Sequence, residues 1–293
     1  MKKILTNFLI LIVSIILLLV LFVSIYTNNI SLLIISTLKT WLYKVMPPIF
    51  IFYIISSILL KLNFFDYFFI IFKPLNKLLK FSNAYALNLY LSNFIIGNPS
   101  ISSLAYDDYQ NNNISKSDYN KIINSSFSAN PLFIISLINN IQYSIIILSS
   151  IIISSIIICT FTNHNKIDNI NINKKITNTN ISIVFYKSIE IVLVIASIMI
   201  FFNLIINTLN YFQIPNYFCI PLELCNSLII VVDLNLVYIL KIPLMCSLIV
   251  FNCFSIHIQI FSQIKYNYAH FLLSRIIAST LSFIICFIIF LHF

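Results

Sequence analysis

The stretch IIGNPSISSL, residues 95–104, and the stretch SFSANPLFII, residues 126–135, decide how this chain folds. Each places an Asn-Pro pair within apolar sequence of the kind that forms membrane helices. Asn is a favoured helix cap, and a proline at the first helical position lacks only an N–H that the helix does not use. We therefore expect one helix to begin at Asn98 and another at Asn130. Lipid offers no partner to the free N–H groups of such starts, so they indicate a protein interior or a water-lined cavity.

The composition is that of an integral membrane protein. Of the 293 residues, 60% are hydrophobic and 9% are charged, and the mean hydropathy is +1.00, whereas soluble domains carry roughly 25% charged residues. Apolar runs occupy residues 8–23, 45–60, 131–159, 183–209, 228–240 and 271–291. The longer runs reach the ~20 residues that cross a bilayer, and the shorter ones predict partial or broken segments. The predicted fold is all-α and polytopic, with about eight membrane segments that include broken or re-entrant helices.

Lysines predict the orientation of the chain. Lys2 and Lys3 precede an apolar run that ends near Val23, and no small-residue cleavage site follows it. We expect an uncleaved first span with a cytoplasmic N-terminus; a signal peptide is the alternative. The lysines of residues 61–80 and of the loop 163–182 place both segments on the cytoplasmic side. The net charge of +9 reflects this topology, and the sequence holds no nucleic-acid-binding motif.

Two parts of the chain resemble each other. IGNP at residues 96–99 precedes SSL at 102–104, and IPLE at residues 220–223 precedes NSL at 226–228 at the same relative positions, an offset of 124. SFSAN at residues 126–130 parallels CFSIH at residues 253–257, an offset of 127. Each half would hold two chain breaks, as in transporters built from inverted repeats; chance similarity in a low-diversity alphabet is the alternative. The predicted organisation is an N-terminal span at 1–30, a first repeat at 31–160, a connecting loop at 161–182 and a second repeat at 183–293.

Six stretches carry a resemblance to a known family. In order they are WLYKVMPPIFIFYIISSILL (41–60), GNPS (97–100), DYNKIINSSFSANPLFI (118–134), PLELCN (221–226), FNCFSIHIQ (251–259) and SRI (274–276). Over residues 35–290 the chain resembles the YlbJ-type sporulation integral membrane proteins, which carry the nucleoside-recognition Gate domain. Glycines of the family pattern are replaced here by Ser102, Pro221, Asn252 and Cys253.

The resemblance implies a role in endospore formation. Members of the family act in the mother cell, at the outer membrane around the forespore, and are associated with the passage of dipicolinate toward the spore. The Gate domain is shared with nucleoside transporters. We therefore expect a transporter of a small anion such as dipicolinate, embedded in the lipid bilayer. A nucleoside-type transporter and a non-transporting scaffold for spore-envelope assembly are the alternatives.

A site for a flat dianion would combine helix N-termini, one or two cations and an apolar wall. The breaks at Gly97, Asn98, Pro99 and Asn130 would supply N–H groups and amides. Arg275 is the only arginine of the chain and lies in an apolar run, where it must be paired or face a polar interior. Its planar fork suits a carboxylate.

The partner of Arg275 is open at this point: either the substrate or an internal carboxylate, Glu223 or Asp233. Glu223 would compensate a helix dipole or exchange a proton during transport. His257 would be a satisfied structural group or a proton-linked gate. Gln259 would contact the substrate or unpaired backbone.

Signatures of enzymes are absent from the sequence. It has no H-E-x-x-H, no G-x-S-x-G and no P-loop. Its six cysteines form no C-x-x-C pair and lie mostly in apolar context. We therefore expect no catalytic residues, no metal site and no cofactor, and transport that a gradient drives or that is passive. Whether the chain forms a homo-oligomer stays open.

Overall fold

The computed structural model describes residues 30–61, 74–162 and 181–292, together with residues 14, 17–23, 25–26 and 72. The elements of this part of the chain are all helical, as predicted. In chain order they are α2 (Ile30–Thr40), the π-helical turn η1 (Trp41–Val45), α3 (Met46–Lys61), α5 (Asn76–Leu79), α6 (Ala84–Ile96), α7 (Ser100–Gln110), α8 (Lys116–Ser125), α9 (Pro131–Ile138), α10 (Ile141–Phe161), α11 (Ile181–Tyr211), the 3-10 turn η3 (Asn216–Cys219), α12 (Leu224–Asp233), α13 (Tyr238–Phe251), α14 (Cys253–Phe261) and α15 (Tyr268–Leu291).

Helices of the described chain support an integral membrane protein. Five helical stretches are long and apolar enough to cross a membrane: Ile30–Leu59, Ile141–Phe161, Ser182–Tyr211, Tyr238–Phe261 and Tyr268–Leu291. Two shorter apolar helices are α6 and α12. Most of the expected first span at 1–30 and of the expected loop at 161–182 lies outside the described residues. The expected total of about eight membrane segments therefore stays a prediction.

The apolar run 131–159 is two helices, which hydropathy alone does not predict. After α9 ends, Asn139 takes the left-handed conformation with φ 52°, and the side chain of Asn140 accepts a hydrogen bond from the N–H of Tyr143. Asn visits left-handed backbone more readily than most residues, and its side chain is a favoured cap. Two neighbouring asparagines therefore end one helix and start the next.

The two breaks of the first half lie against each other. Between α6 and α7, Gly97 has φ +73°, and the N–H of Asn98 donates to the carbonyl of Ser128 at 2.8 Å. A Cβ atom at position 97 would lie 2.4 Å from the backbone nitrogen of Asn130. Only glycine permits both this conformation and this approach. The helix breaks predicted near 97–99 and at 130 are confirmed.

The second half contains a similar pair of breaks. One separates η3 from α12, and the other is Asn252, whose left-handed conformation with φ 68° separates α13 from α14. The N–H of Phe254 donates to the carbonyl of Pro221 at 2.8 Å, and the N–H of Ser255 donates to that of Leu222 at 2.9 Å. In both halves, backbone hydrogen bonds thus hold one break against the other.

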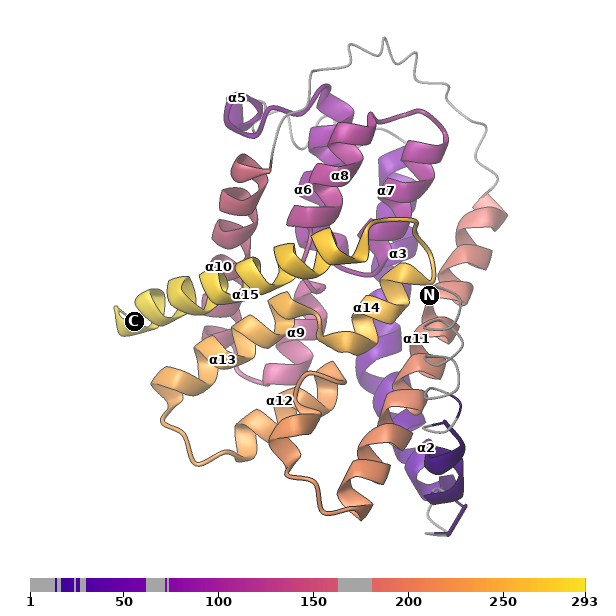
Figure 1. Ribbon diagram of the computed structural model, residues 1–293. Helices are drawn as coiled ribbons and strands as arrows, with labels where there is room; N and C mark the ends of the chain where they lie inside the picture. Colours follow the sequence, from indigo (N-terminus) through magenta and orange to yellow (C-terminus); the bar gives the residue numbers. More distant parts are fainter. Residues whose placement is uncertain are drawn as a thin grey trace, which may run out of the picture.

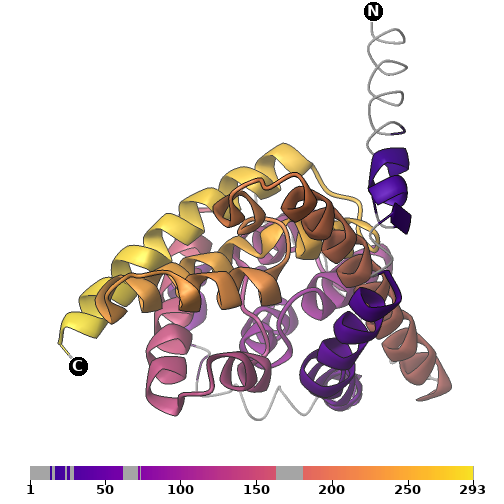
Figure 2. The ribbon, with the colours of Figure 1, turned by 90° about the horizontal axis from the view of Figure 1, so that it is seen from below.

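Packing brings the breaks into the interior. α15 packs against α13 and α10, α8 packs against α10 and α15, and α11 packs against α2 and α3. Figures 1 and 2 show α13 and α15 side by side, crossing the direction of α3, α6 and α7. One apolar core joins residues of α9, α10, α12 and α13, and a second joins residues of α6, α7 and α8. The interrupted backbone is therefore enclosed by helices.

Candidate functional site

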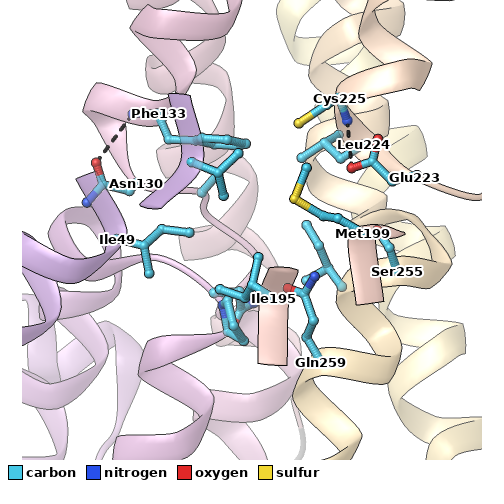
Figure 3. A pocket seen from close by; sticks show the side chains of 15 residues that line it. Ile49, Asn130, Phe133, Ile195, Met199, Glu223, Leu224, Cys225, Ser255 and Gln259 are labelled. Atoms are coloured by element: carbon cyan, nitrogen blue, oxygen red, sulfur yellow. Dashed lines mark hydrogen bonds between the residues drawn. The ribbon is translucent and has the colours of Figure 1, made fainter. Parts of the chain in front are cut away.

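A narrow cavity lies where the breaks of the two halves face each other (Figure 3). Its volume is about 30 Å³, which holds about two water molecules. Its polar lining consists of Asn98, Asn130, Glu223, Cys225, Ser255 and Gln259. Its apolar lining consists of Val45, Ile49, Pro99, Ala129, Phe133, Ile195, Met199, Leu224 and Ile256. Both halves of the chain therefore contribute to one site.

Asn98 is not the helix cap that the sequence predicts. Pro99 occupies the cap position of α7, which has no side-chain cap, and Ser100 is the first helical residue. The amide nitrogen of Asn98 donates to the carbonyl of Ser126, and its amide oxygen accepts from the hydroxyl of Ser102 at 2.7 Å. The side chain thus ties the first break to the second, because the tight approach at Gly97 brings the 126–130 segment within its reach.

Asn130 is the cap that the sequence predicts. Its amide oxygen accepts from the N–H groups of Leu132 at 2.9 Å and Phe133 at 3.4 Å, and Pro131 starts α9. Its amide nitrogen donates to the carbonyl of Ile95 at 3.1 Å. Both polar atoms of the side chain already have protein partners, so Asn130 shapes the cavity wall.

Glu223 caps α12 from inside the protein. Its two carboxyl oxygens accept from the N–H of Cys225 at 3.1 Å and the N–H of Asn226 at 2.9 Å, and the residue is 3% exposed. The predicted compensation of a helix dipole is confirmed. No lysine or arginine of the described chain pairs with this carboxyl group. Because a carboxylate offers about four acceptor positions, part of its capacity stays open toward the cavity.

Arg275 has neither of its predicted carboxylate partners. It is 0% exposed, and its guanidinium donates to the carbonyls of Ile123 at 2.9 Å, Asn124 at 3.3 Å and Ser126 at 2.8 Å. These carbonyls belong to the last turn of α8, where a cation stabilises the helix dipole. The guanidinium also lies 4.3 Å from the ring centroid of Phe271. An ion pair with Glu223 or Asp233 is therefore the wrong expectation.

His257 is a buried structural group outside the cavity lining. Its Nε2 lies 2.8 Å from the carbonyl oxygen of Phe251, and its Nδ1 lies 3.3 Å from the hydroxyl of Tyr268. Since a carbonyl only accepts, Nε2 carries the hydrogen and, in the neutral ring, Nδ1 accepts from the tyrosine. The ring packs against Phe254 and Phe271. The contact satisfies a carbonyl at the end of α13.

Two polar side chains in the cavity lack partners. Gln259 is 3% exposed and Ser255 is 1% exposed, and neither side chain makes a hydrogen bond within the described part of the chain. Both line the cavity from α14 (Figure 3), where their spacing of four puts them on one helix face. A buried amide without a partner is costly unless water or a ligand occupies the space beside it.

The sequence located part of this lining. The predicted site residues that line the cavity are Asn98, Pro99, Asn130, Glu223 and Gln259. The predicted residues outside the lining are Gly97, His257 and Arg275. Sequence reasoning missed Cys225 and the apolar wall, while Ser255 shares the four-residue spacing that would have identified it.

The charge of the lining differs from that expected of an anion site. The lining residues include one carboxyl group and no lysine, arginine or histidine. Comparisons of the chain with models of protein families, with curated proteins and with solved structures found no significant match.

Proposed function

We propose that this protein is a membrane transporter and that the cavity between its chain breaks holds a small polar solute. One observation carries the proposal. The side chains of Ser255 and Gln259 are buried without hydrogen-bond partners in the described chain, and they lie beside the open acceptor positions of Glu223. Interrupted helices at membrane depth leave polar backbone that is tolerated only around such internal sites. A scaffold would gain nothing from these interruptions, which reduce stability.

Hydrogen bonds between the breaks support a duplicated unit. The N–H of Asn98 donates to the carbonyl of Ser128, and the N–H of Ser255 donates to the carbonyl of Leu222. At the offsets of 124 and 127 residues, Asn98 corresponds to Leu222 and Ser128 to Ser255. The same two positions therefore pair in each half, with the direction of the bond reversed.

Helix starts support the same correspondence. α7 starts at Ser100 and α12 starts at Leu224, an offset of 124. The side chain of Asn140 caps α10, and that of Asn267 caps α15, an offset of 127. Asn140 and Asn267 lie outside the matched stretches, and chance similarity of those stretches would not align these two helix starts. We take the halves to be inverted repeats, as in transporters that alternate access around a central site.

The lining favours an uncharged polar solute, such as a nucleoside-type compound. Hydroxyl, amide and carboxyl groups at Ser255, Gln259 and Glu223 suit hydroxyls and ring N–H groups. A dianion such as dipicolinate would meet the carboxyl group of Glu223 without any cation in the lining, and burying an unpaired charge is costly. In this proposal Glu223 also carries the coupling proton, since an intramembrane carboxyl group can exchange one as access alternates.

In this proposal the structure corresponds to a closed state of the transporter. A cavity of about 30 Å³ is far below the ~300–1,000 Å³ of typical sites for organic ligands. Binding would require the paired breaks to move apart, or one half to rock against the other. The location in the mother-cell membrane around the forespore, and a role in sporulation, rest on the sequence resemblance.

The test is solute flux in proteoliposomes that contain the purified protein. We expect uridine to enter faster than in protein-free liposomes and faster than dipicolinate. Gln259→Met should lower uridine flux about tenfold, because one neutral hydrogen bond to the solute is lost. Gln263→Met is the matched control, since the amide of Gln263 is also buried and unpaired but does not line the cavity. Absence of flux for both solutes would favour the scaffold, and faster flux of dipicolinate would restore the anion transporter.

A further inference from the structure

A second hollow lies between one end of α7 and α8 and the connection from α14 to α15. Its volume is about 490 Å³, and it shares no lining residue with the central cavity. Four tyrosines form much of its wall: Tyr106, Tyr109, Tyr119 and Tyr266. Figure 1 shows that the α14–α15 connection passes close to α7 and α8.

The charges of this hollow are positive. Lys116, Lys265 and His270 line it and are exposed, and no carboxyl group is among its lining residues. Nearby acidic groups are engaged elsewhere. Asp107 pairs with Lys187. The carboxylate of Asp108 accepts from the hydroxyl of Tyr85 and the amide of Asn113, and that of Asp118 accepts from Ser82 and Ser115. Within the described chain, neither lysine of the hollow forms an ion pair with a carboxyl group.

The tyrosines pack against one another, and the hydroxyls of two of them are free in the described chain. Tyr109 and Tyr119 are stacked at 4.9 Å between centroids, and Tyr266 meets Tyr119 edge-on at 6.0 Å. The hydroxyl of Tyr119 donates to the carbonyl of Lys265 at 3.2 Å and so fixes the connection to α8. The hydroxyls of Tyr106 and Tyr109 make no hydrogen bond within the described part of the chain. Burial raises the pKa of Tyr266, so its phenol stays a neutral donor.

An apolar stripe leads away from the hollow along α15. The stripe starts next to His270, which lines the hollow. It shares one helix face with that residue, as the spacings show, and consists of Leu273, Ile277 and Ile284. These three are exposed, at 56%, 49% and 54%. On a membrane-spanning helix, such a face lies against lipid chains. The hollow therefore adjoins an exposed apolar stripe that suits lipid chains, and tyrosines and lysines are enriched where such chains meet water.

We propose that this hollow binds the phosphate-bearing headgroup of an anionic phospholipid whose acyl chains lie along α15. The two lysines and the free tyrosine hydroxyls supply cations and donors for the phosphate. The amide groups of Gln110 and Asn120, which also line the hollow, suit the hydroxyls of a glycerol headgroup. A soluble phosphate would use the same cations but would gain nothing from the apolar stripe.

The test is lipid retention by the full chain in nanodiscs that contain equal amounts of phosphatidylglycerol and phosphatidylcholine. The ratio of the two lipids that stay bound after extraction into detergent is measured by native mass spectrometry. We expect the wild-type protein to retain phosphatidylglycerol preferentially. The double variant Lys116→Gln with Lys265→Gln should lose that preference by about 10- to 30-fold, since each lysine near an anionic lipid contributes severalfold.

The matched control is Lys39→Gln with Lys77→Gln, which removes two exposed lysines outside the hollow. We expect its lipid ratio to equal that of the wild-type protein. An equal loss in this control would assign the preference to overall surface charge and overturn the proposal. So would a wild-type protein without preference. Displacement of the lipid by inorganic phosphate in large excess would assign the hollow to a soluble anion, which also contradicts the proposal.

Discussion

The end of α8 and the start of α12 each bury one charge, and the two charges serve different purposes. At the end of α8, Arg275 donates to three carbonyls and packs on Phe271. At the start of α12, Glu223 accepts from two N–H groups and borders the cavity. The cation lies at the negative C-terminal end of α8, and the carboxyl group lies at the positive N-terminal end of α12, so each stabilises a helix dipole. The resemblance between the two regions ends there.

The difference lies in the hydrogen-bonding capacity that remains. The guanidinium of Arg275 is enclosed by α8 and aromatic rings, so no ligand can reach it without rearrangement. The carboxyl group of Glu223 keeps acceptor positions on the side of the cavity. A buried charge in apolar sequence therefore indicates a ligand site only where part of its capacity is unused and space adjoins it.

Of the substitutions that test this comparison, Arg275→Met should lower stability the most. The substitution removes three charge-assisted hydrogen bonds, each worth about 1.5–3 kcal/mol, and leaves buried carbonyls at the end of α8 unpaired. We expect the free energy of unfolding to fall by at least about 3 kcal/mol in denaturant titrations of the purified protein. Arg275→Lys keeps a cation that donates hydrogen bonds, so its loss of unfolding free energy should be smaller. A stable Arg275→Met variant that no longer transports would make Arg275 a ligand contact after all.

The next effect concerns Asn130, which holds two breaks together. Asn130→Leu removes a cap and the hydrogen bond to Ile95, so we expect a loss of about 1–3 kcal/mol, with solute affinity falling in step. Asn83→Leu is the matched control, because the side chain of Asn83 caps α6 away from the cavity. Its loss should be smaller, about 1 kcal/mol, without a change in affinity. If affinity falls while stability holds in Asn130→Leu, the amide binds the solute directly.

A smaller change in stability is expected for Glu223→Gln. A glutamine oxygen can still accept one of the two capping bonds, so the loss should stay below about 1 kcal/mol. Flux driven by a proton gradient should nevertheless fall to the level seen without a gradient, because an amide exchanges no proton. Glu190→Gln, at an exposed position of α11, is the control. If gradient-driven flux in Glu223→Gln equals that of the wild-type protein, Glu223 does not carry the coupling proton and only stabilises the start of α12.

The smallest effect on stability, and one of opposite sign, is expected for Gln259→Met. The amide is buried without a partner in the described chain, so its replacement by an apolar side chain of similar size should raise stability by up to about 1 kcal/mol. Thermal unfolding of the two proteins side by side measures this. A loss of stability would mean that the amide has a structural partner, such as ordered water, and would weaken the proposed solute contact.

Local sequence chemistry predicted the all-helical fold and several of its helix breaks. Glycine, proline and asparagine have strong conformational preferences, so the breaks near Gly97, at Asn130 and before Glu223 could be located without coordinates. The break at Asn139 was missed because residues 131–159 were interpreted as one apolar run, although Asn139 and Asn140 interrupt it. Hydropathy counts side chains and is insensitive to a single left-handed residue.

The site was harder to predict because the partners of its polar groups are backbone atoms. The carbonyls that Arg275 satisfies have no sequence signature, since every residue carries one. A carboxylate was therefore the natural but wrong expectation. Gln259 was identified because it is a polar residue beside His257 in the second predicted break. Apolar wall residues such as Met199 resemble any other residue of the core.

The close approach at Gly97 has an evolutionary consequence. The one glycine among the 293 residues stands where a side chain would collide with the peptide of Asn130. The fitness of any substitution at position 97 should then depend on the state of residues 128–130. Suppressors of a Gly97→Ala defect are expected to map to that segment and to leave α12 and its cap unchanged.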